Sequence, residues 1–379
     1  MKSLKRGIAV VLAVALALAF AACHPKDEIS ATVTDKKSGI SIDITTAQYL
    51  YAMTNAVMEA QNNIKEANPD DTIEDYTKYK VVEEGEDGKE EKTKYNKWIE
   101  SRTEELLREY AGAMVKQKEL KLKIEDSQLS SAEQMASIYW QYYGYQSIFE
   151  QNGVAYETYK KMLMSSYYEN EYFLSIYDTD GTDPIDEKTV SKEFYDNYCL
   201  ANTISIATSN GEDTEDAEDT ENTEETVTVD EAKKILKEYK SRIEKGESFE
   251  DIYIEHNKAN ASSDEEVDSS EMPVVYMSEE TGTDDEHFED IYKMKKGALK
   301  ILTNADESEV ILVQKLDISE NEKEEDSYYN NYRESVLYMI KGEEFETDFH
   351  KFCESFKIEK KKAANRLKFD KIITDTEEQ

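Results

Sequence analysis

An alternation of apolar and polar residues over residues 40–45 predicts a short β-strand near the start of the mature chain. From Tyr49 to Ile64 the apolar residues then recur every three or four positions, which is typical of a helix with one buried face. Thr45 and Gln48 stand between these patterns in the arrangement of a capping box, where each side chain binds the other residue's backbone N–H. A strand followed directly by a capped helix is therefore predicted.

The helical pattern continues after a charged segment at residues 79–95, which is predicted to be a loop or hairpin. Apolar residues from Trp98 to Val115 recur at helical spacing and predict a long buried helix. Shorter helical segments follow, with Gly153 as a helix breaker between two of them. Residues 31–190 are thus predicted to be a mostly helical N-terminal part.

The pattern changes to a mixture of strands and helices over residues 191–320. "TISIAT" alternates as a strand, Thr228 and Glu231 form a second capping box, and "PVVYM" and "VILVQKL" read as later strands. This order predicts a compact α+β domain. Its acidic run, residues 210–225, is predicted to be disordered, and it lacks the regular ligand spacing of a calcium loop.

Residues 326–379 return to helical spacing, with Phe345, Phe349 and Phe352 among the apolar positions. An apolar helix that follows a separate domain needs a partner, and the N-terminal helices are the obvious one. The predicted fold class is α+β: a mostly helical domain built from N- and C-terminal parts, with an inserted domain of helices and a small antiparallel sheet.

The first 22 residues predict an export signal, because basic residues precede a short apolar run that ends in small residues before Cys23. We expect Cys23 to be the lipidated first residue of the mature protein, with residues 23–30 as a tether. The alternative is an ordinary cysteine after a conventionally cleaved signal. Lipidation would place the protein outside the cytoplasm, anchored to the bacterial cell membrane.

The charge of the chain and its histidines and cysteines limit which binding partners, metal sites and disulfides can be expected. The net charge of −38 disfavours nucleic acid. None of the four histidines is spaced for a metal site with cysteine or with another histidine, so neither a metal nor a cofactor is predicted. Cys199 and Cys353 are either a disulfide pair or two separate buried thiols, and the second reading is favoured.

The order of these elements resembles that of the PrsA/SurA foldases, exported chaperones that carry a parvulin-type peptidyl-prolyl isomerase domain. The resemblance covers nearly the whole mature chain. It is carried by "GISIDITTAQYLYAM", "LSSAEQM" and "GVAYETYKKML", and within the inserted domain by "DEAKKILKEYKSRIEKGESFEDIYIEHNK" and "HFEDIYKMKKGAL". It implies a protein that binds unfolded, newly exported polypeptides.

The catalytic residues of parvulins match less well than the order of elements. Thr203 and Ile311 stand where the resemblance would place the two catalytic histidines, and only Phe288 matches a residue of the proline pocket. His256 and His287 lie outside the family's catalytic segments, so we expect surface or helix-end roles for them. The resemblance thus implies a parvulin-like domain that is weakly active or inactive.

Three functions remain open at this point. The first is a lipid-anchored chaperone with a degenerate parvulin-like domain. The second is an active peptidyl-prolyl cis-trans isomerase with a divergent site, and the third is a structural surface lipoprotein. A solute-binding lipoprotein is disfavoured because the repeated strand-helix alternation of such two-lobed folds is missing.

Overall fold

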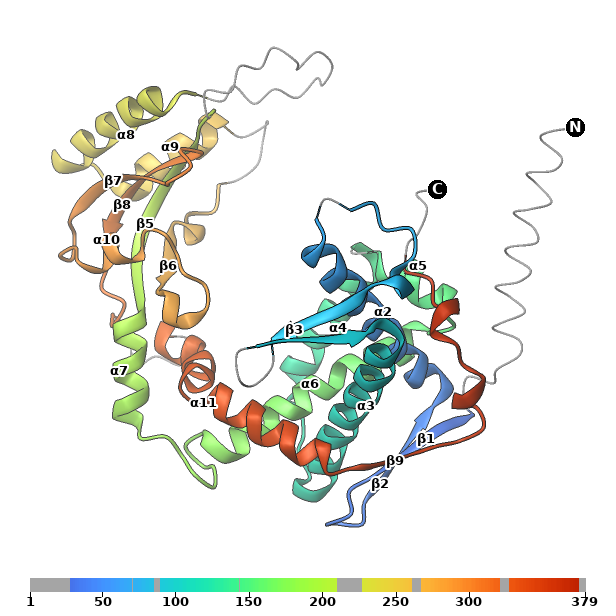
Figure 1. Ribbon diagram of the computed structural model, residues 1–379. Helices are drawn as coiled ribbons and strands as arrows, with labels where there is room; N and C mark the ends of the chain where they lie inside the picture. The colour runs from blue at the N-terminus through green and yellow to red at the C-terminus, as the bar shows by residue number, and fades with distance from the viewer. Residues whose placement is uncertain are drawn as a thin grey trace, which may run out of the picture. The chain divides into compact units, whose positions relative to one another are not determined.

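The computed structural model describes residues 28–69, 71–84, 89–142, 144–209, 227–260, 267–320 and 327–374. The chain divides into two compact units (Figure 1). The helical unit comprises the residues up to Thr182 together with those from Glu343 onward, and the inserted unit comprises Asp183–Gly342. The predicted boundaries of the inserted domain, residues 191–320, lie inside the second unit.

Within the described residues, five helices lie wholly inside the helical unit. They are α2 (Thr46–Ala67), α3 (Tyr95–Leu120), α4 (Asp126–Tyr142), α5 (Tyr145–Gln151) and α6 (Tyr156–Tyr177). The last residues of α11 (Tyr328–Glu354) also belong to it. The predicted capping box at Thr45 and Gln48 is confirmed at the start of α2.

A three-stranded antiparallel sheet joins the two ends of the chain within the helical unit. Its strand order is β2-β1-β9, formed by β2 (Ser41–Thr45), β1 (Ile29–Thr34) and β9 (Lys357–Lys360). Val33 faces Ile42 on one side and Ile358 on the other. β1 therefore begins inside the segment expected to be a tether.

The C-terminal segment corrects one prediction. Helix α11 ends at Glu354, and the chain continues as β9 and two short 3-10 turns, Ala364–Arg366 and Phe369–Lys371. The segment 326–379 is thus helical only in its first half. Burial alternates along β9, with Lys357 and Glu359 exposed and Ile358 and Lys360 half-buried, as expected for a strand that has solvent on one side.

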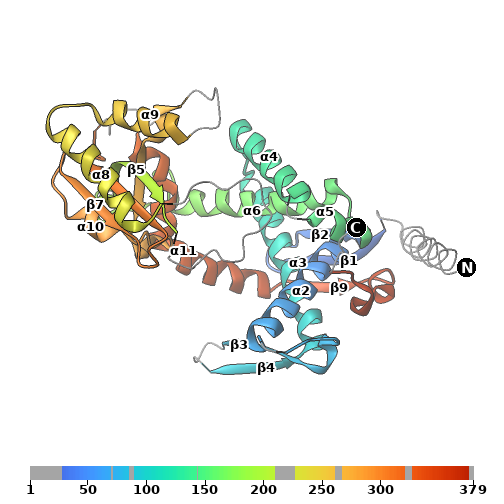
Figure 2. The same ribbon diagram turned by 90° about the horizontal axis from the view of Figure 1, so that it is seen from above.

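Helices α2, α3 and α6 form the core of the helical unit. A continuous cluster of buried apolar residues from α2, α3 and the sheet includes Ile44, Leu107 and Phe356. The predicted charged segment is a hairpin, β3 (Lys80–Glu84) paired with β4 (Glu90–Lys94), beside α2 and α3 (Figure 2).

The inserted unit is built on a four-stranded antiparallel sheet of order β6-β5-β8-β7. Its strands are β5 (Tyr198–Ala207), β6 (Pro273–Met277), β7 (Leu299–Thr303) and β8 (Glu309–Lys315). Its helices are α7 (Glu187–Asn197), α8 (Val229–Glu244), α9 (Phe249–Asn260) and α10 (Phe288–Tyr292), with the first part of α11. The strand β7 was not predicted, whereas the capping box of α8 at Thr228 and Glu231 is confirmed.

Two separate cores cover the two faces of this sheet. On one face, Ile204 and Leu312 pack against Leu236 of α8 and Ile252 of α9. On the other face, strand residues pack against Phe288 and Ile291 of the short helix α10. The sheet is therefore the middle layer of the inserted unit, with α8 and α9 on one side and α10 on the other.

Within the described residues, no helix has both the length and the hydropathy to cross a membrane. The export signal, Cys23 and the acidic run 210–225 lie outside the described residues.

Candidate functional site

The α10 face of the four-stranded sheet is where the family resemblance places a proline pocket. Residues two apart on a strand share a face, so Cys199, Ala201 and Thr203 of β5 lie together on this side. Thr203 faces Val313 across the β5–β8 pairing, and Ile311 lies two pairs farther along, opposite Ser205. Residues two apart on a strand share a face, so the structure places Thr203 and Ile311 on the same face of the two central strands.

A tyrosine that the sequence did not single out closes this face. The Tyr276 hydroxyl, on β6, lies 3.0 Å from Oγ1 of Thr203, within hydrogen-bond distance. Burial raises the pKa of Tyr276 to about 12, so its hydroxyl is protonated at neutral pH. Thr203 and Tyr276 thus form a pair of neutral hydroxyls, which can donate and accept hydrogen bonds but cannot supply an imidazole's acid-base chemistry at neutral pH.

Phe288 lies inside the core on this face. Its side chain is 4% exposed, and it belongs to one cluster with Tyr276 and Ile311, which are 8% and 3% exposed. Its ring also stacks on Tyr292 at 5.2 Å between centroids. All three side chains are therefore buried core residues on this face of the sheet.

The two histidines of the inserted unit lie at different places relative to the sheet. His256 is buried on α9, on the opposite side of the sheet, where its Nε2 is 3.2 Å from the Ser205 carbonyl oxygen and its Nδ1 is 3.5 Å from the Tyr239 hydroxyl. Burial lowers the pKa of His256. The expected surface or helix-end role is therefore wrong for this histidine, which links α9 to β5; His287 directly precedes α10, at a helix end as expected.

The two described cysteines are free and buried, one in each unit. Burial raises the pKa of both thiols. The reading of Cys199 and Cys353 as separate thiols is confirmed, and neither has the lowered pKa of a reactive cysteine.

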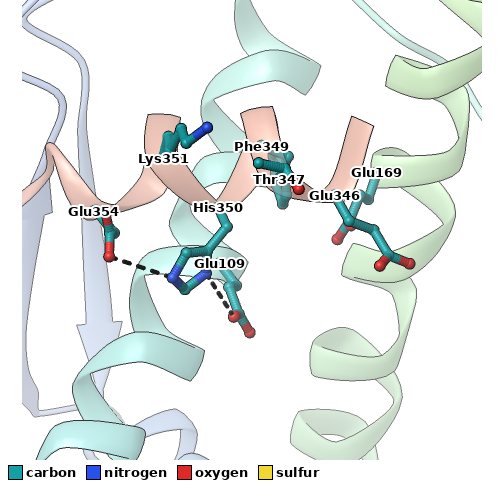
Figure 3. A pocket seen from close by; sticks show the side chains of 8 residues that line it. All are labelled: Glu109, Glu169, Glu346, Thr347, Phe349, His350, Lys351 and Glu354. Carbon is teal, nitrogen blue, oxygen red and sulfur yellow. Dashed lines mark ion pairs between the residues drawn. The ribbon is translucent and has the colours of Figure 1, made fainter. Parts of the chain in front are cut away.

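The helical unit contains a cavity of about 580 Å³ with charged walls (Figure 3). It lies among α3, α6 and the end of α11, and its lining includes Glu109, Glu169, Glu346, Phe349 and His350. Carboxylates outnumber the cationic side chains around it. Such a cavity attracts cations and does not suit apolar peptide segments.

Burial and mutual repulsion perturb the carboxyl groups of this cavity. Burial, with repulsion from Glu109 and Glu346, raises the pKa of Glu169 to about 7. Burial also raises the pKa of Glu109, although Arg102 opposes the effect. A raised carboxyl pKa means that the fold carries unfavourable negative charge at neutral pH, which a proton or a bound cation relieves.

No local pattern in the sequence predicts this cavity. Glu105, Glu109 and His350 come from helices that are more than 200 residues apart in the chain, and only the docking of α11 on α3 brings them together. Metal-ligand spacing along a sequence is typically recognised between histidines and cysteines. In this cluster a single histidine lies beside carboxylates instead. An acidic pair four residues apart on a helix is common on surfaces and predicts nothing alone.

The chain was compared with known proteins. No protein-family model matches the sequence, and no curated protein does. Among solved structures, the chain is similar to the foldase protein PrsA from Streptococcus pneumoniae, with 17% identity and a TM-score of 0.39, covering 75% of this chain and 97% of that one. It is also similar to PrsA from Bacillus subtilis, with 14% identity and a TM-score of 0.33, covering 72% of this chain and 90% of that one. Foldase protein PrsA from Lactococcus lactis shows 16% identity and a TM-score of 0.34, with 69% of this chain and 86% of that one covered.

Proposed function

We propose that this protein is an extracytoplasmic foldase-chaperone, lipid-anchored through Cys23, that binds unfolded exported polypeptides on its helical unit. The inserted parvulin-like unit is weakly active or inactive as a peptidyl-prolyl isomerase. The observation that carries the proposal is the packing of the sheet face beside α10. Tyr276, Phe288 and Ile311 occupy it as core residues, and His256 lies on the opposite side of the sheet.

The chemistry of proline isomerisation explains why this packing matters. The barrier to rotation about the peptide bond is about 18–20 kcal/mol. An isomerase lowers it by holding the proline ring in an apolar pocket and stabilising the twisted amide with placed polar groups. Apolar side chains that pack on one another as core residues are less available to a proline ring, although the hydroxyls of Thr203 and Tyr276 remain close together.

Helix α4 offers the apolar surface that binding an unfolded chain requires. Leu129 and Met135 on this helix are 38% and 39% exposed, and Leu120 at the end of α3 is 49% exposed. Farther along the same helix, Ala136 and Trp140 are buried and fasten α4 to α5 and α6. Methionine and leucine side chains adapt to many apolar partners, which suits a chaperone with varied clients.

Replacing Leu129 and Met135 by serine should weaken chaperone activity while leaving the fold intact, because both side chains are exposed. Losing these apolar contacts should cost about 1 kcal/mol of binding free energy, or roughly fivefold in affinity. The measurement is the concentration of protein that halves the aggregation of a chemically unfolded client.

The matched control is Val274→Ser on β6, which removes an equally exposed apolar side chain (37%) from the inserted unit. It should leave the half-suppression concentration unchanged. Equal effects of the two changes would refute a client surface on α4. A wild-type protein that fails to suppress aggregation would favour the alternative of a structural surface lipoprotein.

A second candidate function, an isomerase with a divergent site, is favoured by one observation only. The paired hydroxyls of Thr203 and Tyr276 lie on the face where the family resemblance places its catalytic groups. A rate of proline isomerisation that rises with protein concentration would support it.

A further inference from the structure

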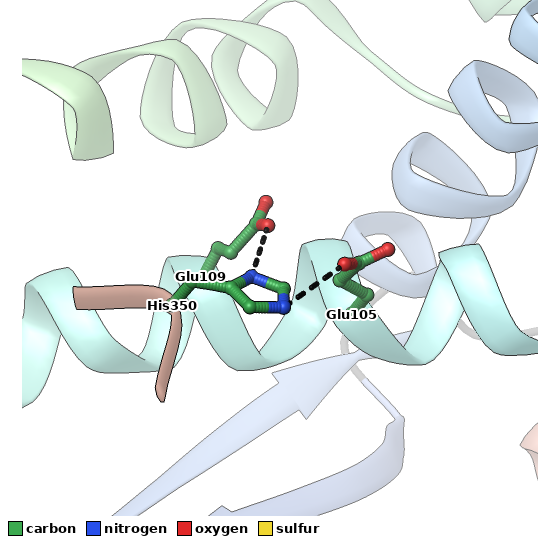
Figure 4. Close-up of side chains that lie close together, drawn as sticks. All are labelled: Glu105, Glu109 and His350. Carbon is green, nitrogen blue, oxygen red and sulfur yellow. Dashed lines mark ion pairs between the residues drawn. The ribbon is translucent and has the colours of Figure 1, made fainter. Parts of the chain in front are cut away.

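Helices α3 and α11 bring two carboxylates and an imidazole together at one place in the helical unit (Figure 4). Glu105 and Glu109 lie one turn apart on α3, and His350 approaches them from α11. The contact is close because Gly112, one further turn along α3, has no side chain. A Cβ there would overlap Sγ of Cys353 and lie 3.2 Å from the Phe349 ring.

Each ring nitrogen of His350 faces a carboxylate. Nε2 lies 3.6 Å from Oε1 of Glu105 and 3.4 Å from Oε1 of Glu354, and Nδ1 lies 3.8 Å from Oε1 of Glu109. These separations exceed the 2.7–2.9 Å that is typical of a charge-assisted hydrogen bond. They suit donors around a metal ion, since Zn²⁺ with bonds of about 2.0–2.2 Å in a tetrahedron places neighbouring ligand atoms roughly 3.4 Å apart.

The negative charges beside His350 are only partly neutralised by the protein, so a divalent cation could bind there. Arg102 binds Glu59 at 2.7 Å and Oε2 of Glu105 at 2.9 Å, and it lies 3.6 Å from Glu109. One guanidinium thus neutralises only one of three carboxylates. Arg102 and these three carboxylates together carry two negative charges when His350 is neutral. Oε1 of Glu105, the oxygen nearer His350, is not the atom that Arg102 contacts at 2.9 Å.

There is also space for an ion and its remaining ligands. A cavity of about 130 Å³ is lined by Glu105, Glu109, His350 and Glu354, among others. The larger acidic cavity shares three of these residues, Glu109, His350 and Glu354 (Figure 3).

We propose that this cavity binds one divalent transition-metal ion of the Zn²⁺ type, through Nε2 of His350 and the carboxylates of Glu105 and Glu354. Glu109, whose Oε1 lies 3.8 Å from Nδ1, would accept a hydrogen bond from Nδ1–H on closer approach and so fix the tautomer of the imidazole, as carboxylates beside metal-bound histidines do. The mixed nitrogen and oxygen donors favour Zn²⁺, Co²⁺ or Ni²⁺ over Ca²⁺, which takes oxygen ligands. The bound ion would fasten the end of α11 to α3.

The test is calorimetric titration of Zn²⁺ into the untagged full-length protein after treatment with a chelator. We expect one site per chain that excess Ca²⁺ does not displace. His350→Ala and Glu105→Gln should each weaken this site more than roughly 100-fold, and Glu109→Gln, a positioning change, by about 10–100-fold. Tryptophan-monitored thermal unfolding should shift to higher temperature with Zn²⁺ in the wild type but not in His350→Ala.

Matched controls separate this site from the general acidity of the chain. His287→Ala removes a histidine from the inserted unit, and Glu119→Gln removes a carboxylate from the same helix α3; both should bind Zn²⁺ like the wild type. Binding that survives His350→Ala, or that Ca²⁺ displaces, would overturn the proposal. So would an equal loss of affinity in His287→Ala.

Discussion

Ending the chain at Ser355 should unfold the helical unit and leave the inserted unit folded. The truncation removes Phe356, which is 3% exposed in the main core, and the strand β9 that pairs with β1. It also removes Phe369, whose ring contacts Tyr95 at 6.5 Å between centroids. Loss of one buried phenylalanine alone costs about 3–5 kcal/mol, against a total domain stability of about 5–15 kcal/mol.

Tryptophan fluorescence measures this result directly. The chain has two tryptophans, Trp98 and Trp140, and both are buried in the helical unit. We expect their emission in the truncated chain to match that of the urea-unfolded protein, while far-ultraviolet circular dichroism keeps the signal of the inserted unit. Lys357→Thr, an exposed change on β9, should behave as the wild type. Native emission from the truncated chain would show that the last segment is dispensable.

Phe288→Ala should destabilise the inserted unit by about 3–5 kcal/mol without changing the rate of proline isomerisation in a short peptide. The reason is that Phe288 is a core residue packed among Tyr276, Ile311 and Ile291. Unfolding in urea, followed by circular dichroism, measures the first effect, and a peptide isomerisation assay measures the second.

The control is Tyr292→Ala on the same helix, where the removed ring is 39% exposed. Its loss should cost about 0.5–1.5 kcal/mol, the contribution of one aromatic pair. A wild-type protein that accelerates isomerisation, and loses this activity with Phe288→Ala, would instead identify Phe288 as a pocket residue of a working isomerase.

Local sequence signals predicted the parts of the fold that depend on neighbouring residues. Both capping boxes were correct, because a box needs only residues three positions apart. The strands β1 and β9 were missed because each is short and is stabilised by pairing with the other, over 300 residues away. No periodicity within six residues reveals such a partner.

The candidate sites also depend on residues that are distant in the sequence, which local patterns do not reveal. The structure brings Thr203, Ile311 and Phe288 to one side of the sheet, but Tyr276 was not identified from the sequence. Its role depends on β6 lying beside β5, which the sequence of β6 alone does not encode. The cluster around His350 depends likewise on the packing of two distant helices at Gly112.

Whether the protein acts as a chaperone or as an isomerase can be measured in the refolding of a client that has a slow, proline-limited phase. One refolding trace gives both the yield of native client and the rate of that phase. With increasing amounts of the full-length protein, we expect a rising yield of native client and an unchanged rate constant for the slow phase. A rate constant that rises in proportion to the protein, with no gain in yield, would contradict it and establish an isomerase in place of a chaperone.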